Sequence, residues 1–154
     1  MLLEQFIGTW ELVSMVEMAG EKIIGKPYGE SPLGYITYTD TGFMHAILMK
    51  RDRSLVGVSI EDLGSVKKKW AVFAIFRYFK ALMNYFKASA SFSAYSGIYE
   101  IKNDKICHHV KSSFFPDWIN NDLIRDFEFF NDKLKLTAHN NDSTRIELVW
   151  QKKD

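Results

Sequence analysis

The most constraining feature of the sequence is a succession of short apolar runs separated by turn residues. About ten such runs, rich in β-branched and aromatic residues, occur at 11–18, 22–24, 34–39, 43–49, 55–60, 93–101, 106–112, 123–130, 134–138 and 145–150. Runs of this length and composition predict β-strands. Asn-Asp pairs at 103–104 and 131–132 tolerate the left-handed conformation of tight turns, so antiparallel hairpins are expected. Because closure removes exposed edges, we predict an all-β, up-and-down barrel of eight to ten strands.

One segment, at about residues 65–90, does not follow this strand pattern. Its polar residues Arg77, Lys80, Asn84 and Lys87 lie three or four positions apart, which predicts one inserted amphipathic helix with an aromatic and aliphatic remaining surface. Arg77 and Lys80 interrupt the apolar stretch that a membrane span would need. Three roles remain for this helix: a lid over the barrel mouth, a contact with a membrane interface, or a dimer contact.

Length and charge predict a single domain over residues 1–154. A chain of 154 residues that is 47% hydrophobic can bury a substantial core. Residues 66–88 carry six basic and no acidic side chains, which leaves 14 basic against 19 acidic residues elsewhere. This distribution argues against a general nucleic-acid-binding protein. The single cysteine and an acidic Glu4, where a secretory signal needs basic residues, predict a cytoplasmic location.

Sequence signatures of catalysis are missing from the chain. It contains no nucleophile elbow, phosphate loop, dinucleotide-binding glycine pattern or HExxH string, so we expect a binding protein without a cofactor rather than an enzyme. Potential metal ligands crowd together at Cys107, His108 and His109. Adjacent residues of a strand point to opposite faces, so His108 and His109 cannot converge on one ion, and no metal site is expected.

Candidate ligand-binding residues follow from what a mostly apolar cavity needs. His108 shares a strand face with Val110 and Ser112; if that face lines the interior, His108 is a buried polar group that needs a partner and is the candidate catalytic residue. Arg125 is a candidate anchor for a carboxylate, or else a surface arginine paired with Asp126 or Glu128. The other candidate ligand contacts are aromatic: Tyr35, Tyr38, Tyr95, Tyr99, Trp118, Phe76 and Phe79.

The first strand contains a motif with a family resemblance. Phe6 to Ser14 reads FIGTWELVS and resembles the opening strand of the calycins, the lipocalins and fatty-acid-binding proteins, whose hallmark is Gly-x-Trp. The chain is similar to the lipocalin-like domain family in particular, through residues 32–38, 42–44, 94–100 and 108–110 and, further on, Ser113, Pro116, Trp118 and Arg125. This resemblance implies a calycin-like barrel with an internal cavity. Trp10 is expected to plug one barrel end, with Arg145 or Trp150 stacked on it.

Three functions are compatible with these observations. The leading hypothesis is that the barrel binds a hydrophobic small molecule, such as a fatty acid or polyketide, beneath the helical lid. A second is a cofactor-free cyclase or isomerase of natural-product or lipid metabolism, because positioning a flexible substrate can accelerate a reaction without a nucleophile. A third is an interaction module in which residues 66–88 contact an anionic membrane or a second copy of the chain.

Overall fold

The computed structural model describes residues 2–57, 59, 71–140 and 142–153, which group into two compact units. One unit includes the chain up to Arg51 and from Ser93 onward, and it contains all nine strands of the described chain. The other runs between Asp52 and Phe92 and contains a long helix. Each unit is described by itself.

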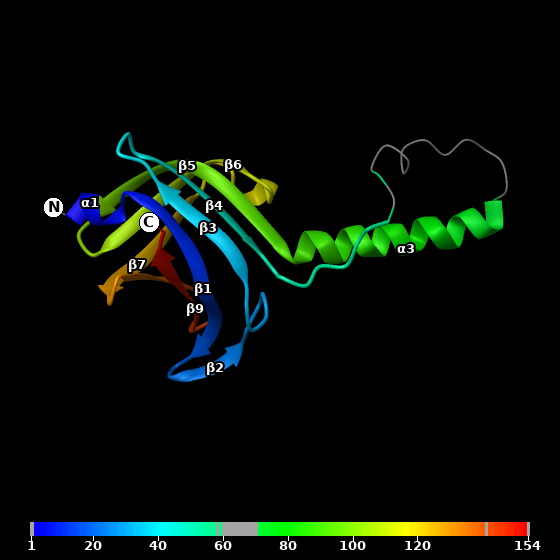
Figure 1. The fold of residues 1–154 in the computed structure, drawn as a ribbon, viewed down its shortest axis with the longest axis horizontal. Helices are drawn as coiled ribbons and strands as arrows, with labels where there is room; N and C mark the ends of the chain where they lie inside the picture. Colours follow the sequence, from blue (N-terminus) through cyan, green and yellow to red (C-terminus); the bar gives the residue numbers. More distant parts are fainter. Residues whose placement is uncertain (1, 58, 60–70, 141, 154) are drawn as a thin grey trace. The chain divides into compact units, whose positions relative to one another are not determined.

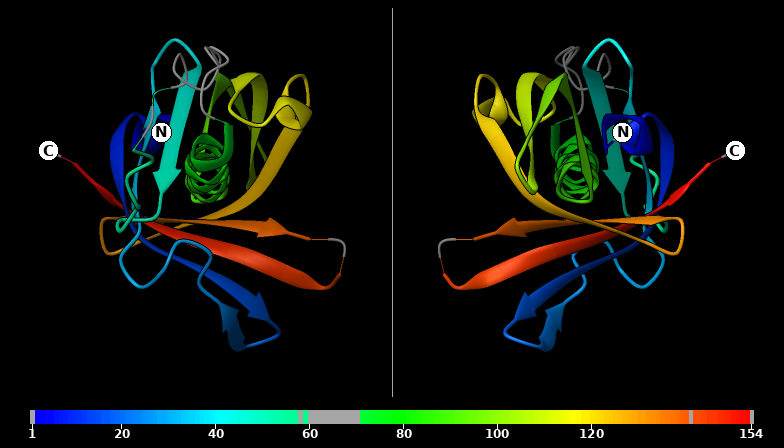
Figure 2. Two further views of the ribbon diagram at one scale, coloured as in Figure 1. Left: turned by 90° about the vertical axis from the view of Figure 1, so that its right-hand side faces the viewer. Right: turned by 90° about the vertical axis from the view of Figure 1, so that its left-hand side faces the viewer.

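The strands of the first unit form a closed antiparallel barrel (Figure 1 and Figure 2). They are β1 (Gly8–Ala19), β2 (Lys22–Gly25), β3 (Leu33–Tyr38), β4 (Phe43–Met49), β5 (Phe92–Lys102), β6 (Lys105–Ser113), β7 (Asp122–Phe130), β8 (Lys133–His139) and β9 (Thr144–Lys152). β1 pairs with β3, each strand from β3 to β8 pairs with the next, and β9 returns to pair with β1. The short β2 pairs beside the end of β1, so eight strands close the barrel. The predicted up-and-down barrel is confirmed.

Local turn chemistry accounts for the hairpins. Asn103 has φ 56°, and Asn131 and Asp132 have φ 46° and 59°, which is the left-handed region that asparagine and aspartate tolerate. These residues separate β5 from β6 and β7 from β8. The expectation of antiparallel hairpins at both Asn-Asp pairs is therefore confirmed.

The strand predicted at residues 55–60 is wrong. The structure has neither helix nor strand at residues 53–57 and 59, while residues 58 and 60 lie outside the described chain. The side-chain amide of Asn84 donates hydrogen bonds to the carbonyl oxygens of Leu55 and Val56, at 3.4 Å each. Carbonyl groups that a strand neighbour would satisfy are thus satisfied by a side chain of the helix.

The predicted helix is present as α3 (Ala71–Ala90); its predicted beginning near residue 65 lies outside the described residues. Within this unit, Ala81 is buried, and the Arg53 guanidinium donates a hydrogen bond of 2.9 Å to the carbonyl oxygen of Ala88. Phe76 and Phe79, in contrast, are exposed. None of the helices in the described residues is long and apolar enough to cross a lipid bilayer.

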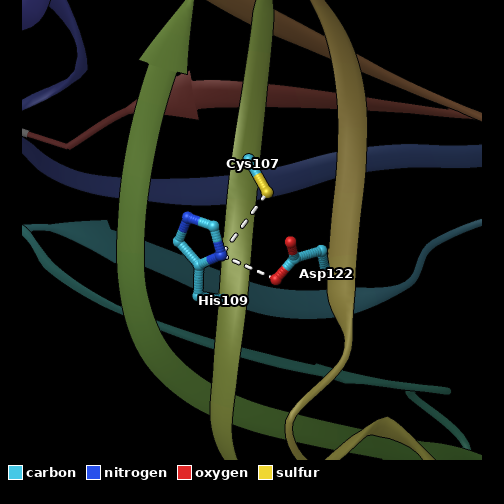
Figure 3. Close-up of side chains that lie close together, drawn as sticks. All are labelled: Cys107, His109 and Asp122. Carbon is cyan, nitrogen blue, oxygen red and sulfur yellow. Dashed lines mark hydrogen bonds and ion pairs between the residues drawn. The ribbon is translucent and has the colours of Figure 1, made fainter.

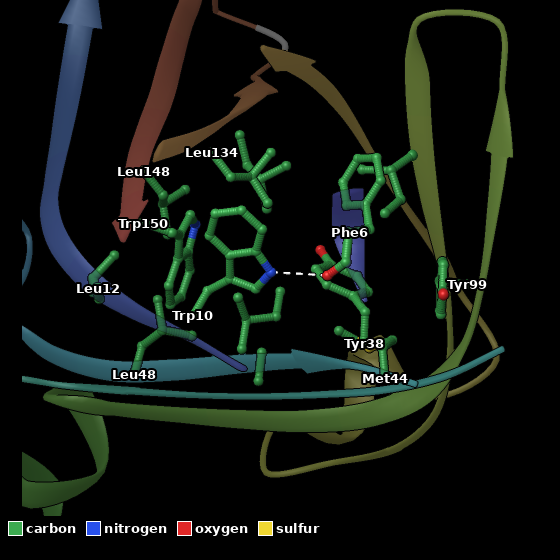
Figure 4. Close-up of a cluster of buried hydrophobic side chains, with 14 residues drawn as sticks. Phe6, Trp10, Leu12, Tyr38, Met44, Leu48, Tyr99, Leu134, Leu148 and Trp150 are labelled. Atoms are coloured by element: carbon green, nitrogen blue, oxygen red, sulfur yellow. Dashed lines mark hydrogen bonds between the residues drawn. The ribbon is translucent and has the colours of Figure 1, made fainter. Parts of the chain in front are cut away.

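One end of the barrel is filled by aromatic side chains (Figure 4). The short helix α1 (Leu2–Phe6) brings Phe6 into edge-to-face contact with Tyr38, Phe127 and Phe129, at centroid distances of 4.9–5.4 Å. The Trp10 indole N–H donates a hydrogen bond of 2.8 Å to the Phe6 carbonyl oxygen. Full burial of each large side chain contributes about 1.5–3 kcal/mol, so this plug stabilises the barrel end.

The predicted plug at Trp10 is confirmed, but its cation partner differs from the expectation. The Lys152 ammonium group lies 5.3 Å from the Trp10 ring centroid. Strand register explains this, because Trp10 is opposite Lys152 in the β1–β9 pair, whereas Arg145 is opposite Met18 at the other end. Arg145 instead donates a hydrogen bond to the carbonyl oxygen of Gly20 at 2.6 Å.

Candidate functional site

A buried histidine between two tyrosines lies inside the barrel. On β6, Ile106, His108 and Val110 point inward, and His108 is fully buried. Its Nε2 lies 2.9 Å from the Tyr38 hydroxyl, and its Nδ1 lies 3.1 Å from the Tyr95 hydroxyl. The sequence predicted that an inward His108 would need a partner, and strands β3 and β5 supply two.

The surroundings of His108, Tyr38 and Tyr95 keep all three side chains uncharged. Burial, assisted by the Arg125 cation and by His109, lowers the pKa of His108 from 6.5 to about 3. Burial also raises the pKa of Tyr95, and it raises that of Tyr38 well above the ordinary phenol value. Because a neutral imidazole has one donor and one acceptor nitrogen, one tyrosine donates to His108 while the other accepts from it.

This arrangement suits positioning better than proton transfer. An efficient general base has a pKa near the working pH, and a pKa of about 3 makes His108 a weak base at neutral pH. The two tyrosine hydroxyls, whose pKa values are raised, are correspondingly weak acids. The geometry therefore favours a role for His108 in holding the Tyr95 hydroxyl in place.

Tyr95 borders a cavity of about 230 Å³ in the barrel. Most of its wall is apolar and comes from Met15, Ile36, Leu48, Leu136, Ala138, Ile146, Leu148 and Trp150. The polar side chains of Ser93, Tyr95, Asn140 and Arg125 also line it, together with Trp118. Trp118 ends the short helix η1 (Pro116–Trp118) and contacts the Tyr95 ring edge-to-face at 5.6 Å. An apolar wall with a few polar groups is typical of small-molecule sites.

Arg125 reaches the cavity without an acidic partner. Its guanidinium donates a hydrogen bond of 2.9 Å to the carbonyl oxygen of Ile124, and it forms no ion pair with any of the described residues. Asp126 and Glu128, the two expected surface partners, form ion pairs with other cations. Since side chains alternate along β7, these two acids lie on the face opposite Arg125, so the surface-pair alternative is wrong.

The closed barrel and its cavity agree with a family assignment by sequence. A family model described as a lipocalin-like domain matches residues 7–153. The chain belongs to the lipocalin-like domain family. The family resemblance of the Gly-x-Trp strand is thus confirmed over nearly the whole chain. No curated protein matches this lipocalin-like domain.

Several solved structures are similar to this lipocalin-like domain at low sequence identity. A redesigned β-barrel is 10% identical, with 99% of this chain and 95% of that chain covered and a TM-score of 0.46. An uncharacterized protein from Bacteroides eggerthii is 15% identical, with 96% and 99% covered and a TM-score of 0.45. The fluorescent protein UnaG is 15% identical, with 98% and 99% covered and a TM-score of 0.43.

Two other predicted site residues, Tyr99 and Tyr35, do not line the cavity. Tyr99 packs edge-to-face on Tyr38 at 4.9 Å and donates to the Thr39 carbonyl oxygen at 2.8 Å, so it belongs to the core of this lipocalin-like domain. Tyr35 is 44% exposed on the outer face of β3, because only the alternate positions of that strand point inward. Phe76 and Phe79 lie on α3 in the other unit, and their assignment to the ligand site stays a prediction.

Sequence reasoning did not assign a ligand role to Trp150. It lines the cavity and is 1% exposed, and its indole N–H is the one buried side-chain polar atom of the described residues without a hydrogen-bond partner. An unsatisfied buried donor is costly, about 1–3 kcal/mol. The alternation of β9 places Trp150 on the same face as Leu148 and was the available signal in the sequence.

A second group of polar side chains lies on the outer face of β6 and β7 (Figure 3). The Cys107 sulfur lies 3.8 Å from His109 Nδ1, and the same nitrogen lies 2.6 Å from Asp122 Oδ1. His108 and His109 do point to opposite faces, as expected. Cys107 and His109 share the outer face two positions apart, and the carboxylate that joins them comes from the neighbouring strand, which the local sequence does not reveal.

Proposed function

We propose that this lipocalin-like domain binds a compact hydrophobic acid inside its barrel, with Arg125 as the anchor of the acidic group. The observation that carries the proposal is a guanidinium with no acidic partner among the described residues, bordering a mostly apolar cavity. A carboxylate offers such a group a charge-assisted, bidentate partner. The apolar wall would then bury the rest of the ligand.

Two further donors support a ligand with more than one acceptor atom. The Tyr95 hydroxyl borders the cavity and is held by His108 Nδ1 at 3.1 Å. The Trp150 indole N–H, which has no partner in the described chain, is available to a carbonyl or hydroxyl oxygen of a ligand. Groups held in advance lose little freedom on binding, which favours affinity.

The size of the cavity narrows the ligand class. Its volume of about 230 Å³ is below the roughly 300–1,000 Å³ of common small-molecule pockets. A short-chain or single-ring-system acid therefore fits better than a long-chain fatty acid. Catalysis of cyclisation or isomerisation has less support, because the pKa of His108, about 3, leaves it poorly suited to proton transfer.

The first experiment identifies what occupies the cavity. The purified protein is denatured and searched by mass spectrometry for a stoichiometric small acid. In parallel, binding of naphthoate and of naphthamide is measured by titration calorimetry, because the two probes share a ring system and differ in the charge of the head group. We expect naphthoate to bind more tightly than naphthamide, at one molecule per chain.

Substitution of the anchor tests its role directly. Arg125→Ala should weaken naphthoate binding about 10- to 100-fold, the effect of losing a hydrogen-bonded charge partner, and leave naphthamide binding unchanged. Arg51→Ala is the control, because Arg51 lies on the surface and bonds the Ser31 carbonyl oxygen. Unchanged naphthoate affinity in Arg125→Ala would remove Arg125 from the site. Failure of both probes, with no co-purified acid, would contradict ligand binding.

A second function is favoured by the exposed aromatic face of α3. Phe76, Phe79 and Phe86 are 73%, 62% and 68% exposed, and Lys80 and Lys87 lie on the same helix. We propose that α3 contacts an anionic membrane surface. Residues 66–88 contain no acid, and each basic residue near such a surface contributes about 1 kcal/mol.

Vesicle flotation tests the membrane contact. The protein should float with vesicles that contain phosphatidylserine and not with pure phosphatidylcholine vesicles. Phe79→Ser should reduce flotation, whereas Phe43→Ser, which removes a 60% exposed phenylalanine from β4, should not. If the protein forms a dimer in solution and does not bind anionic vesicles, the partner of α3 is a second copy of the chain rather than a membrane.

A further inference from the structure

The outer group on β6 and β7 is positioned by strand register. In the β6–β7 pair His109 is directly opposite Asp122, and Cys107 is two positions from His109 on the same strand face. Across the other edge of β6, Cys107 is opposite Glu100 on β5. Three neighbouring strands therefore hold a thiol, an imidazole and two carboxylates on one side of the barrel wall.

The two nitrogens of the His109 ring face different groups. Nδ1 faces both the Cys107 sulfur, at 3.8 Å, and Asp122 Oδ1, at 2.6 Å. Nε2 faces Glu100 Oε2 at 3.6 Å, and Glu100 in turn pairs with Lys102 at 2.8 Å. A histidine that binds a metal commonly has a carboxylate at its other nitrogen, which orients the ring and increases its basicity.

The same geometry is unsuitable for a nucleophilic thiol. In a Cys-His-Asp triad the thiol and the carboxylate contact different imidazole nitrogens, so that a proton can be passed through the ring. Here both contact Nδ1.

We propose that Cys107 Sγ, His109 Nδ1 and Asp122 Oδ1 form a binding site for a divalent cation of the zinc class, with Glu100 as the carboxylate that orients His109. The donor set of one sulfur, one nitrogen and one oxygen suits Zn²⁺ or Co²⁺ and does not suit Mg²⁺ or Ca²⁺, which prefer oxygen ligands. With three protein ligands, a fourth tetrahedral position is open to water.

The distances are close to those of a metal site. The ligand atoms all lie within 4.8 Å of one another. Around a tetrahedral zinc ion, with bonds of about 2.0–2.3 Å, neighbouring ligand atoms are separated by roughly 3.3–3.7 Å. The distance from sulfur to Nδ1 is already near this range, and Asp122 Oδ1 needs to move by under about 1 Å from the imidazole. The Asp122 side chain is 55% exposed and so has room to rotate.

The single cysteine of the chain makes the test unambiguous. Tag-free protein is titrated with Co²⁺ in the presence of a phosphine reductant, which contributes no thiol, and the cobalt–thiolate charge-transfer absorption in the near ultraviolet is recorded. Any such absorption reports Cys107. We expect it to saturate at one Co²⁺ per chain and to disappear when Zn²⁺ is added, because Zn²⁺ competes for the same site.

Matched variants distinguish a metal site from ordinary surface charge pairs. Cys107→Ser should abolish the thiolate absorption, and Asp122→Asn should weaken Co²⁺ binding at least tenfold. His139→Ala is the control, because His139 lies 2.6 Å from Asp126 in a similar imidazole–carboxylate pair without a thiol. That variant should bind Co²⁺ as the unmodified protein does. No thiolate absorption at saturating Co²⁺, or binding that is equal in Asp122→Asn, would overturn the proposal.

Discussion

The two faces of strand β6 give adjacent histidines opposite chemistry. His108 points inward, is fully buried and is hydrogen-bonded to two uncharged phenols. His109 points outward, is partly exposed and lies between the carboxylates of Asp122 and Glu100. Alternation along a strand changes the surroundings of a side chain completely within one residue. A function assigned to a pair of neighbouring histidines must therefore be assigned to each separately.

The largest expected effect on stability comes from a substitution that disturbs both faces of β6 at once. Gly97 lies opposite Val110 where the β5–β6 register shifts, and a Cβ there would lie 2.0 Å from the His109 carbonyl oxygen. Because this neighbour is backbone, Gly97→Ala should destabilise the protein by at least about 4 kcal/mol in urea unfolding. Gly25→Ala is the control, since its new Cβ would meet the flexible end of Glu17 at 3.0 Å. Equal stability of the two variants would contradict the close approach.

Substitution of each histidine by leucine compares the two faces directly. His108→Leu leaves the Tyr38 and Tyr95 hydroxyls inside the barrel without their imidazole partner and should cost about 2–4 kcal/mol. His109→Leu removes partly exposed ion pairs and should cost under about 1 kcal/mol. Equilibrium denaturation measures both. A His109→Leu variant that is the less stable of the two would reverse the assignment of the faces.

The lowered pKa of the inward-facing His108 also predicts a pH dependence of stability. The pKa of His108 is lowered from 6.5 to about 3, so between these values the unfolded chain binds a proton that the folded chain does not. Stability should therefore fall as pH decreases below about 6.5, by up to about 1.4 kcal/mol per pH unit. Carboxyl groups of lowered pKa, such as Glu100 and Asp126, lose their contribution only at lower pH.

Denaturation at several pH values between 5 and 6.5 isolates this effect of His108. His108→Gln retains hydrogen-bonding capacity but cannot titrate, so the slope of stability against pH should decrease in this variant. A slope that is the same in both proteins would show that His108 does not cause it.

The smallest expected effect is on ligand affinity, and it is tested with one tyrosine inside the barrel and one on its outer surface. Tyr95→Phe removes a hydroxyl at the cavity and should weaken naphthoate binding roughly fivefold, which corresponds to about 1 kcal/mol. Tyr35→Phe alters an exposed residue whose hydroxyl lies 3.5 Å from Glu11, and naphthoate affinity should not change. An equal effect of the two substitutions would place the ligand elsewhere on the protein.

Local signals were sufficient for most of the fold. Alternating apolar runs and the Asn-Asp turns predicted the hairpins, and the spacing of polar residues predicted α3. The strand expected at residues 55–60 failed for a non-local reason, because β-rich composition does not reveal that Asn84, 28 residues or more further along the chain, satisfies the Leu55 and Val56 carbonyl groups. A β-rich composition is compatible with a strand, but the hydrogen-bond partners of the backbone decide whether the segment forms one.

The sequence by itself determined the barrel, its antiparallel hairpins and the alternation of side chains between the two faces of each strand, because these depend on side-chain period and on turn residues that are neighbours in the chain. Only the tertiary structure decided which partners meet. Tyr38 is 70 residues from His108, and Asp122 is 13 residues from His109. Strand register, which is set by closure of the whole barrel and by its packing, places these groups within hydrogen-bond distance.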